Sequence, residues 1–362
     1  MLYIINGQVV LPGKIITRAG LVVKGKKIVA ITGKQAPPRG AVKIDARGNF
    51  IAPGFIDLHI HGDAELVSCQ QVKGGTTHFL ATLHPAQPAA LLKNIARTLR
   101  LKGRVAGAKV LGLRLEGPFI NRTFCGALAP GTLRAPDLAE AKRIIRQAKA
   151  ALKMVVLAPE LTGAVKLIGL LRRHKIIASL GHSGATYQQA LKGINAGITH
   201  ATHTFNRMAG FDHRAGGALA AVLTEDRVAC EVICDGIHVH PAALRILNSC
   251  KSADKIILIT DSTQAQDAPL KKRCGDVFKL RNGTLYGTAL TLNKALRNAV
   301  KFLGLSLPQA VKLVTLNPAK ALKIDRYKGS IAVGKHADLV IFDQNFDVQM
   351  TIVEGKVAYD NR

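Results

Sequence analysis

The amino-acid sequence predicts an α/β fold, a TIM-like (β/α)8 barrel with a small β-sandwich formed by the N- and C-terminal segments. Eight short apolar runs alternate with helical patterns between residues 55 and 261, and eight strands close such a barrel. The two ends of the chain instead resemble antiparallel strands separated by turn glycines. We therefore expect a barrel of residues 51–329 and a β-sandwich of residues 1–50 plus 330–362.

The eight predicted strands are short, rich in β-branched residues and bounded by polar residues. They are "FIDLHIH" (55–61), "THFLAT" (77–82), "VLGLRLE" (110–116), "MVVLAPE" (154–160), "IIASLGH" (176–182), "ITHATHT" (198–204), "ACEVICD" (229–235) and "IILITD" (256–261). Other segments place apolar residues at helical spacing, as Leu138, Ile144, Ile145 and Ala148 do. These predicted helices are residues 137–152, 164–174, 186–197, 291–304 and 306–322.

The antiparallel strands are predicted at both ends of the chain. They are "LYIINGQVVL" (2–11), "GLVVKGKKIVAIT" (20–32), "ADLVIFD" (337–343) and "VQMTIVEGKVAY" (348–359). Because these segments flank the barrel in the sequence, we expect them to pair with one another.

The composition indicates an ordinary globular protein, with 48% hydrophobic residues. No apolar run reaches the roughly 18 residues of a membrane helix. The start "MLYIINGQVVLPGK" lacks the basic region and cleavage site of a signal peptide. The six cysteines form no C-x-x-C pair, so we expect reduced thiols. These features predict a cytoplasmic protein that contacts no membrane.

The net charge of +28 comes from 51 basic and 23 acidic residues, and it raises the question of anionic partners. The densest basic stretches, "LLRRHK" and "LKKRCGD", hold only three basic residues each. Tryptophan is absent and aromatic residues make up 4% of the chain, so stacking platforms for single strands are not indicated. We favour a solvated basic surface over attraction of an anionic small molecule, and place specific nucleic-acid binding last.

Polar residues gather where the predicted strands end, which is where barrel enzymes carry their catalytic groups. They are His59 and His61, Glu116, His182, His203, Asp235 followed by His238, and Asp261. His59 and His61 lie two residues apart, so both side chains project from one face of their strand. We read the remaining polar candidates as structural: His78, His84, His174, His200, His213 and, as a buried hydrogen-bonding partner, Asp57.

Imidazole and carboxylate groups are ligands that Zn²⁺ and Fe²⁺ prefer, and a catalytic site leaves a position open for water. Glu116, His182 and His203 supply one such set of ligands, while His59 and His61 form a pair that can bind one cation. A bound divalent ion lowers the pKa of the water that it binds, and a nearby carboxylate can then accept the proton of that water. We expect Asp261 to take that role.

Several motifs together are similar to one known family. "PGFIDLHIHG", "LEGPFIN", "GHSGATY", "THATHTFNRM", "CDGIHVHP", "ITDST" and "GSIAVGKHADLVIFD" resemble the amidohydrolase superfamily and, more narrowly, its N-acetylglucosamine-6-phosphate deacetylase family. The resemblance covers essentially the whole chain in the same order. It implies a barrel with a terminal β-sandwich, deacetylation of an amino-sugar phosphate in the cytoplasm, and a homodimer.

The resemblance implies specific roles for the strand-end residues. It makes Glu116, His182 and His203 ligands of the main metal ion, with Glu116 able to bridge to a second ion at His59 and His61. It therefore implies one or two divalent ions per subunit, Zn or Fe. Asp261 matches the family's acid/base, and His238 matches the residue that orients or polarises the acetamido carbonyl.

The phosphate-binding pattern of the family is only partly present. Asn206 is kept, and Arg214 matches an arginine that reaches the neighbouring subunit's site. Arg207 stands in place of the usual alanine, and Leu128 in place of a histidine that binds phosphate. We expect Arg207 or Arg122 to replace the missing donor, because guanidinium binds phosphate through two hydrogen bonds.

Three alternatives stay open. The first is another amidohydrolase, such as a cyclic-amide hydrolase or a deaminase, and the second is a deacetylase of a non-phosphorylated or other N-acyl amino sugar. The third is a catalytically silent homologue that binds a sugar or a nucleic acid, which the complete set of metal and acid/base residues disfavours.

Overall fold

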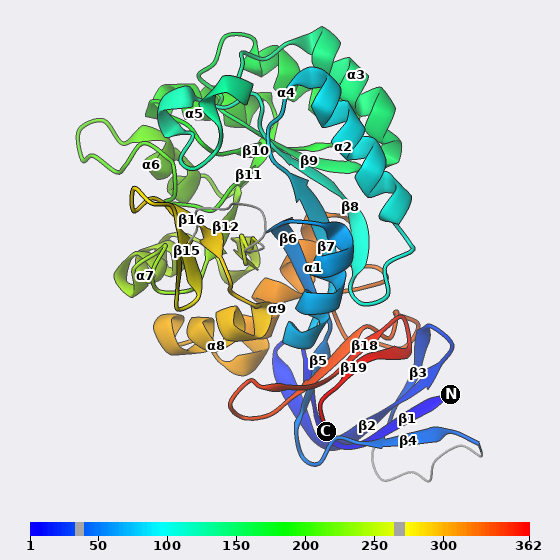
Figure 1. The fold of residues 1–362 in the computed structure, drawn as a ribbon. Coiled ribbons are helices and arrows are strands. Elements are labelled where there is room, and N and C mark those ends of the chain that lie inside the picture. Colours follow the sequence, from blue (N-terminus) through cyan, green and yellow to red (C-terminus); the bar gives the residue numbers. More distant parts are fainter. Residues whose placement is uncertain (33–39, 264–271) are drawn as a thin grey trace.

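The computed structural model describes residues 1–32, 40–263 and 272–362, and it contains a large α/β unit and a second sheet (Figure 1). The α/β unit is a curled parallel sheet covered by helices. The second sheet lies at the lower end of the view and carries both ends of the chain. Within the described residues, no helix has the length and apolar character needed to cross a membrane.

The parallel sheet has eight strands in sequence order, joined edge to edge. They are β6 (Phe55–His61), β7 (Thr76–Leu83), β8 (Lys109–Glu116), β9 (Leu152–Leu157), β10 (Ile177–Leu180), β11 (Ile198–Ala201), β12 (Ala229–Ile233) and β13 (Ile256–Ile259). Each predicted strand is present, although most end two or three residues earlier than the sequence pattern suggests. The loops that follow therefore hold His182, His203, Asp235, His238 and Asp261, whereas His59, His61 and Glu116 lie within β6 and β8.

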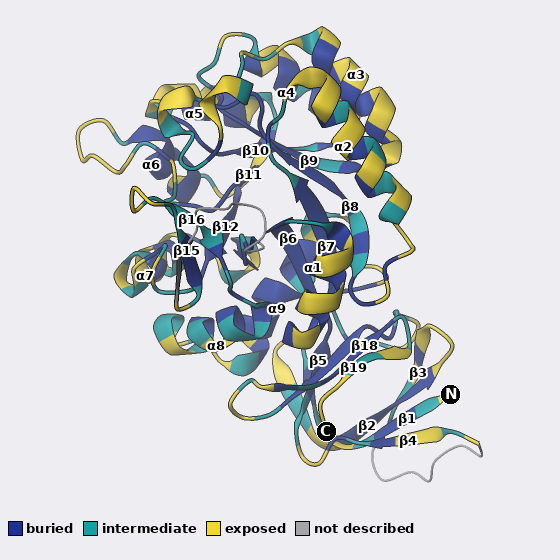
Figure 2. Ribbon diagram, in the orientation of Figure 1, coloured by how far each residue is buried: buried dark blue, intermediate teal, exposed yellow. Residues whose placement is uncertain are grey.

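Helices connect and cover these strands. They are α1 (Ala64–Gln71), α2 (Pro88–Leu101), α3 (Leu138–Ala148), α4 (Ala164–Arg173), α5 (Tyr187–Ala196), α6 (Gly217–Thr224), α7 (Pro241–Cys250), α8 (Leu292–Leu303), α9 (Leu307–Val314) and α10 (Leu316–Ala321). In Figure 2, α2 and α3 are exposed on one side and buried on the other, as amphipathic helices on a sheet should be.

The expected closed barrel is present only in part, because the first and last strands share no continuous ladder. Beyond the end of β13, an isolated bridge pairs Ile60 with Ser262. The Asp261 amide donates to the His59 carbonyl at 3.0 Å, and the His61 amide donates to the Ser262 carbonyl at 2.8 Å. These bonds hold Asp261 beside the two histidines of β6.

The terminal strands form one hydrogen-bonded sheet of eight strands instead of a sandwich of two separate sheets. The reason is β5 (Phe50–Pro53), which pairs in parallel with β1 (Leu2–Leu11) and antiparallel with β17 (Leu339–Phe342). The N-terminal and C-terminal strands are thereby joined into one sheet. Its other strands are β2 (Lys14–Lys24), β3 (Lys27–Thr32), β4 (Val42–Asp45), β18 (Val348–Val353) and β19 (Lys356–Asp360).

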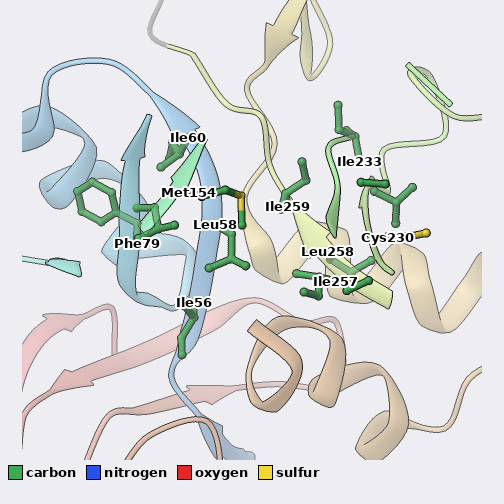
Figure 3. Packing of buried hydrophobic residues seen from close by; sticks show 14 of the residues in the cluster. Ile56, Leu58, Ile60, Phe79, Met154, Cys230, Ile233, Ile257, Leu258 and Ile259 are labelled. Carbon is green, nitrogen blue, oxygen red and sulfur yellow. The ribbon is translucent and has the colours of Figure 1, made fainter. Parts of the chain in front are cut away.

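The buried strand β6 supplies both core and site residues. Ile56, Leu58 and Ile60 belong to the main hydrophobic cluster, which also contains Phe79 and Met154 (Figure 3). Alternate side chains of a strand point to opposite faces, so the polar residues at positions 57, 59 and 61 lie on the other face of β6. This alternation is how a fully buried strand carries a polar site.

The predicted helix 306–322 is two helices, α9 and α10, which meet at Thr315. Pro318 has no amide hydrogen, so it cannot donate to the carbonyl four residues earlier, and the chain leaves helical geometry at Thr315 (φ −132°, ψ −77°). The sequence reading also missed a small antiparallel sheet, β14 (Lys272–Cys274), β15 (Val277–Lys279) and β16 (Leu285–Thr288). This sheet matters because residues of β16 line the cavity described below.

Candidate metal centre and active site

Two groups of potential metal ligands meet at the carboxyl end of the parallel sheet, and Glu116 belongs to both. The first group is His59, His61, Glu116 and Asp261, and the second is Glu116, His182 and His203. The side chain of Asp261 is 16% exposed, and those of the other ligand candidates are at most 5% exposed. Every metal and acid/base candidate from the sequence therefore belongs to one cluster.

The ring nitrogens and carboxylate oxygens of the cluster are in close contact. The Nε2 atoms of His59 and His61 are 3.0 Å apart, and each lies 3.3 Å from Oδ1 of Asp261. Glu116 contacts His61 through Oε2 at 3.2 Å, and His59, His182 and His203 through Oε1 at 3.3, 3.1 and 3.2 Å. Glu116 thus joins the two groups, since its Oε1 contacts histidines of both.

Burial and neighbouring charges shape the protonation of this cluster. Burial, together with the nearby charge of Arg114, lowers the pKa of His59 to about 3. Burial opposes a charge on His61 as well, but hydrogen bonds and charges from Asp261 and Glu116 outweigh it and raise the pKa of His61 to about 9. Although burial opposes ionisation, the histidines hold the pKa values of Glu116 and Asp261 well below their usual range.

The chemistry of the donors fits a divalent cation. The Nε2 atoms of His59 and His61 are 3.0 Å apart, and those of His182 and His203 are 3.1 Å apart. Both pairs surround the carboxylate of Glu116. Lone pairs at that spacing repel one another unless a proton or a cation lies among them. Buried nitrogen and carboxylate ligands of this kind are the set that Zn²⁺ or Fe²⁺ takes in catalytic sites.

Three residues of the cluster have left-handed backbone conformations. The φ angles of His182, His203 and Asp261 are 50°, 28° and 46°. Such angles cost a non-glycine residue roughly 1–3 kcal/mol, and they occur where surrounding structure holds a side chain for function. Each of these residues lies two positions after the last residue of a short strand, where the chain turns to bring the side chain inward.

A second layer of buried polar residues supports the cluster. Asp57 accepts hydrogen bonds from the His59 amide at 3.0 Å and from the Thr260 hydroxyl at 2.6 Å, which matches its predicted structural role. Burial raises the pKa of Asp57 to about 6. Asp57 therefore ties β6 to the last residue before Asp261.

Arg114 lies fully buried inside the curled sheet. Its guanidinium pairs with the fully buried Glu231 at 2.8 Å, and it also donates to the Leu58 carbonyl at 3.1 Å and the Thr202 hydroxyl at 2.9 Å. Leu58 and Thr202 each precede a histidine of the cluster, His59 and His203. Arg114 thus anchors two ligand-bearing segments from one side chain.

A cavity of about 480 Å³ opens over the cluster. Its wall includes three of the candidate substrate-binding residues, Asn206, Arg207 and His238, together with Leu128. The side-chain nitrogen of Asn206 is buried and has no hydrogen-bond partner within the described residues. A free amide group in the wall is available for a polar ligand.

Arg207 is the only lysine or arginine among the described residues of this wall. Its side chain lies against Gly126, where an added Cβ would stand 2.5 Å from Nε of Arg207. The glycine, whose φ is +65°, therefore allows the guanidinium to lie close to the loop that carries Leu128. Arg122, the other arginine considered from the sequence, is exposed and donates to the Leu133 carbonyl instead of lining the cavity.

His238 is held in place by its neighbour Asp235. Nδ1 of His238 lies 2.6 Å from the Asp235 carboxylate, which also accepts the backbone amides of Ile237 and His238 at 2.8 Å. With Nδ1 engaged, Nε2 is the ring nitrogen left for a ligand in the cavity.

The structure corrects the prediction for His84. Its ring stacks on that of His61 with centroids 4.0 Å apart, and His84 lines the cavity instead of serving a purely structural role. His84 follows the end of the second strand, so the rule that found the other histidines applied here too. Tyr286 and Leu285 of β16 also line the cavity, and no local sequence signal placed that segment near the site.

Arg214 does not line the cavity of its own chain. It lies in the exposed segment 211–215, where Asp212 accepts the Arg214 amide at 2.8 Å. Phe211, in the same segment, is 65% exposed. The described structure of one chain thus leaves both side chains at the surface.

Comparisons with known proteins agree with this geometry. The model of the amidohydrolase family matches residues 50–358. The chain is 34% identical to an N-acetylgalactosamine-6-phosphate deacetylase of Escherichia coli O157:H7, covering 85% of this chain and 88% of that protein. It is equally identical to an N-acetylglucosamine-6-phosphate deacetylase of Bacillus subtilis, covering 86% and 85%.

A solved structure is similar over nearly the full length. A mutant N-acetyl-D-glucosamine-6-phosphate deacetylase of Mycobacterium smegmatis, in complex with N-acetyl-D-glucosamine-6-phosphate, superimposes with a TM-score of 0.89. The two chains are 28% identical, and the match covers 99% of each.

Proposed function

This chain belongs to the amidohydrolase family, and we propose that it removes the acetyl group from N-acetylglucosamine-6-phosphate, giving glucosamine-6-phosphate and acetate. The observation that carries the proposal is the buried His/Glu/Asp cluster beneath a cavity whose wall holds Arg207, His238 and Asn206. The test is acetate release by metal-loaded protein.

The residues of the cluster suit amide hydrolysis. His59, His61, Glu116, His182 and His203 would hold one or two divalent ions, with Zn or Fe the expected metal. When bound, such an ion supplies a Lewis acid and lowers the pKa of water at the site. Asp261, whose pKa is held low by His59 and His61 although burial opposes its ionisation, is available as a carboxylate to accept the proton of the attacking water.

The same proton serves the second half of the reaction. An amine leaves poorly unless it is protonated, so Asp261 returns the proton to the sugar nitrogen as the C–N bond breaks. His238, oriented by Asp235, lies in the cavity wall and is assigned to orient or polarise the acetamido carbonyl, on whose oxygen negative charge develops. The products are one acetate and one free amine for each water consumed.

We assign the sugar phosphate to Arg207. A guanidinium in the cavity wall provides the charge-assisted hydrogen bonds that Leu128 cannot supply. Arg207→Ala is expected to raise KM for the phosphorylated sugar roughly tenfold to a hundredfold, because one such bond contributes about 1.5–3 kcal/mol. KM for unphosphorylated N-acetylglucosamine should stay the same.

Arg122→Ala is the matched control, because it removes an exposed arginine from outside the cavity wall. Steady-state kinetics on both sugars would separate the two variants. An unchanged KM for the phosphorylated sugar in Arg207→Ala would show that Arg207 does not bind the phosphate.

N-Acetylgalactosamine-6-phosphate is the second candidate substrate. A relative with that printed activity is as similar to this chain as one acting on N-acetylglucosamine-6-phosphate. The two sugars differ only in configuration at one carbon, so the proposed chemistry is the same for both. A comparison of kcat/KM for the two epimers assigns the preference.

We also propose a homodimer in which Arg214 of one protomer reaches the partner's cavity. The exposure of Arg214 beside the exposed Phe211 supports a protein contact at this segment. Mixing Arg214→Ala with Asp261→Asn should then restore on the order of a quarter of wild-type activity, because random exchange pairs half of the chains into dimers with one complete site. A monomer in sedimentation velocity that is fully active would contradict the dimer.

The proposal also includes a division of the chain into two units and a location in the cell. We treat residues 51–329 as a (β/α)8 catalytic unit, and residues 1–50 plus 330–362 as an accessory β unit. A hydrophobic cluster that consists, apart from Ile51, of residues of the terminal segments supports this division, and it contains Ile4, Leu21 and Ile341. A cytoplasmic location is supported by free thiols at the five cysteines whose side chains are described. Limited proteolysis tests the division, and cell fractionation tests the location.

A further inference from the structure

A second cavity of about 520 Å³ lies at the opposite end of the parallel sheet from the metal-ligand cluster. Residues at the amino ends of four strands line it, namely Ile177 of β10, Thr199 and His200 of β11, Ala229 of β12 and Ile257 of β13. His182, His203 and Asp261 follow the other ends of three of these strands. A ligand in the second cavity therefore lies apart from the reacting groups.

The wall of this cavity is strongly basic. Six of its sixteen residues are lysine or arginine, whereas 51 of 362 residues are basic in the chain as a whole. They are Arg172, Lys175, Arg227, Lys255, Lys320 and Lys323. Only one acidic residue, Asp254, is among the described lining residues, and it is already paired with Lys312.

Most of these positive charges are not neutralised by the protein itself. Arg227 pairs with Glu225 at 2.7 Å. The side chains of the other five have no ion pair or hydrogen bond within the parts of the chain that the structure describes. Several unpaired cations around one concave surface attract a multiply charged anion.

Two buried polar residues in the same wall also have unfilled hydrogen-bonding capacity. His200 is 6% exposed, and its Nε2 has no partner among the described residues, whereas its Nδ1 lies 3.0 Å from the Thr199 hydroxyl. Asn317 is 2% exposed, and its amide donates to two backbone carbonyls at 2.7 Å, leaving Oδ1 without a donor. Buried polar atoms are normally paired, so these atoms point to a polar ligand.

We propose that this cavity is an accessory binding site for a small phosphorylated metabolite that carries hydroxyl groups, such as a sugar phosphate. The phosphate is held by the cations Lys255, Lys320 and Arg172, and a hydroxyl group donates to Oδ1 of Asn317. The volume is within the range of small-molecule sites, roughly 300–1,000 Å³. The site does not depend on which substrate the catalytic cavity accepts.

Glucose-6-phosphate is a suitable probe, because it carries a phosphate and hydroxyls but no acetamido group to hydrolyse. Calorimetric titration of metal-loaded protein in the Arg207→Ala background limits binding at the catalytic cavity. We expect saturable binding of glucose-6-phosphate, weaker binding of inorganic phosphate and no binding of glucose. Absence of saturable binding up to millimolar concentrations would overturn the proposal.

A pair of matched double variants locates the binding site. Lys255→Gln with Lys320→Gln should weaken glucose-6-phosphate binding roughly tenfold or more. Lys142→Gln with Lys356→Gln removes two exposed lysines elsewhere and should change binding less than twofold. Both double variants should keep wild-type kcat, because none of these lysines lines the catalytic cavity.

Two results would contradict the site. Equal weakening in the two double variants would mean that general positive charge attracts the anion. Binding of a single-stranded oligoribonucleotide that Lys255→Gln with Lys320→Gln abolishes, without any binding of glucose-6-phosphate, would make the basic cavity part of a nucleic-acid surface.

Discussion

Asp261→Asn is expected to lower kcat for acetate release by about 10²- to 10⁴-fold, the range that a positioned acid/base contributes. The asparagine side chain keeps the size and an oxygen of the aspartate but can neither accept the water's proton nor return it to the amine. KM should change little, because Asp261 is proposed to act on the reacting atoms. Initial-rate kinetics on the phosphorylated sugar provide the measurement.

Two controls separate this loss from secondary effects. Asp261 also contacts His59 and His61, so the metal content of the variant must be measured alongside its rate. Asp347→Asn makes the same chemical change at an exposed position in the loop before β18 and should leave kcat unchanged. A fall of less than tenfold with full metal content would exclude Asp261 as the acid/base.

Glu116→Gln is expected to empty both ligand groups of metal, because Glu116 is the residue that they share. Activity should fall with the metal, roughly a thousandfold or more, since a bound cation contributes several kcal/mol to the transition state. His61→Asn should be milder in metal loss, because it leaves Glu116, His182 and His203 intact. Elemental analysis after dialysis measures the metal content.

The exposed Glu65 supplies the matched control for this substitution. Glu65→Gln removes the same charge from the surface of α1 and should retain both metal and activity. Full metal content in Glu116→Gln, or equal metal loss in His61→Asn and Glu116→Gln, would contradict a shared ligand.

The strand-end residues could be predicted because their signal is local. His59 and His61 alternate along a buried strand, and Glu116, His182, His203 and Asp261 each follow an apolar run. Parallel strands bring such ends to one edge, so sequence position alone implied that they meet. The contacts of Glu116 with four histidines are consistent with that inference.

Other features depend on contacts between distant segments and could not be inferred in this way. The pairing of Arg114 with Glu231 spans 117 residues, and each residue alone resembles any charged group near a strand. Tyr286 lines the cavity because it belongs to a small sheet that follows β13. The pattern of apolar residues did not predict this sheet. His84 is different, since it directly follows β7 and so obeys the same local rule as the other histidines of the site.

The arrangement of the terminal sheet also depends on contacts between distant segments. Four apolar segments predicted that both chain ends form strands, and they do. Their arrangement as one sheet depends on β5, a four-residue strand between β1 and β17, which is too short to stand out in the sequence. Pairing partners are set by register and packing across the whole sheet, and these are not local properties.

The most direct test of the account is acetate release from N-acetylglucosamine-6-phosphate and from N-acetylglucosamine by the same metal-loaded preparation. The account predicts one acetate for each free amine formed, with kcat/KM at least roughly tenfold higher for the phosphorylated sugar because Arg207 binds its phosphate. Dihydropyrimidine, a cyclic amide, should remain intact. No acetate from the phosphorylated sugar by fully metal-loaded protein would contradict the proposed function.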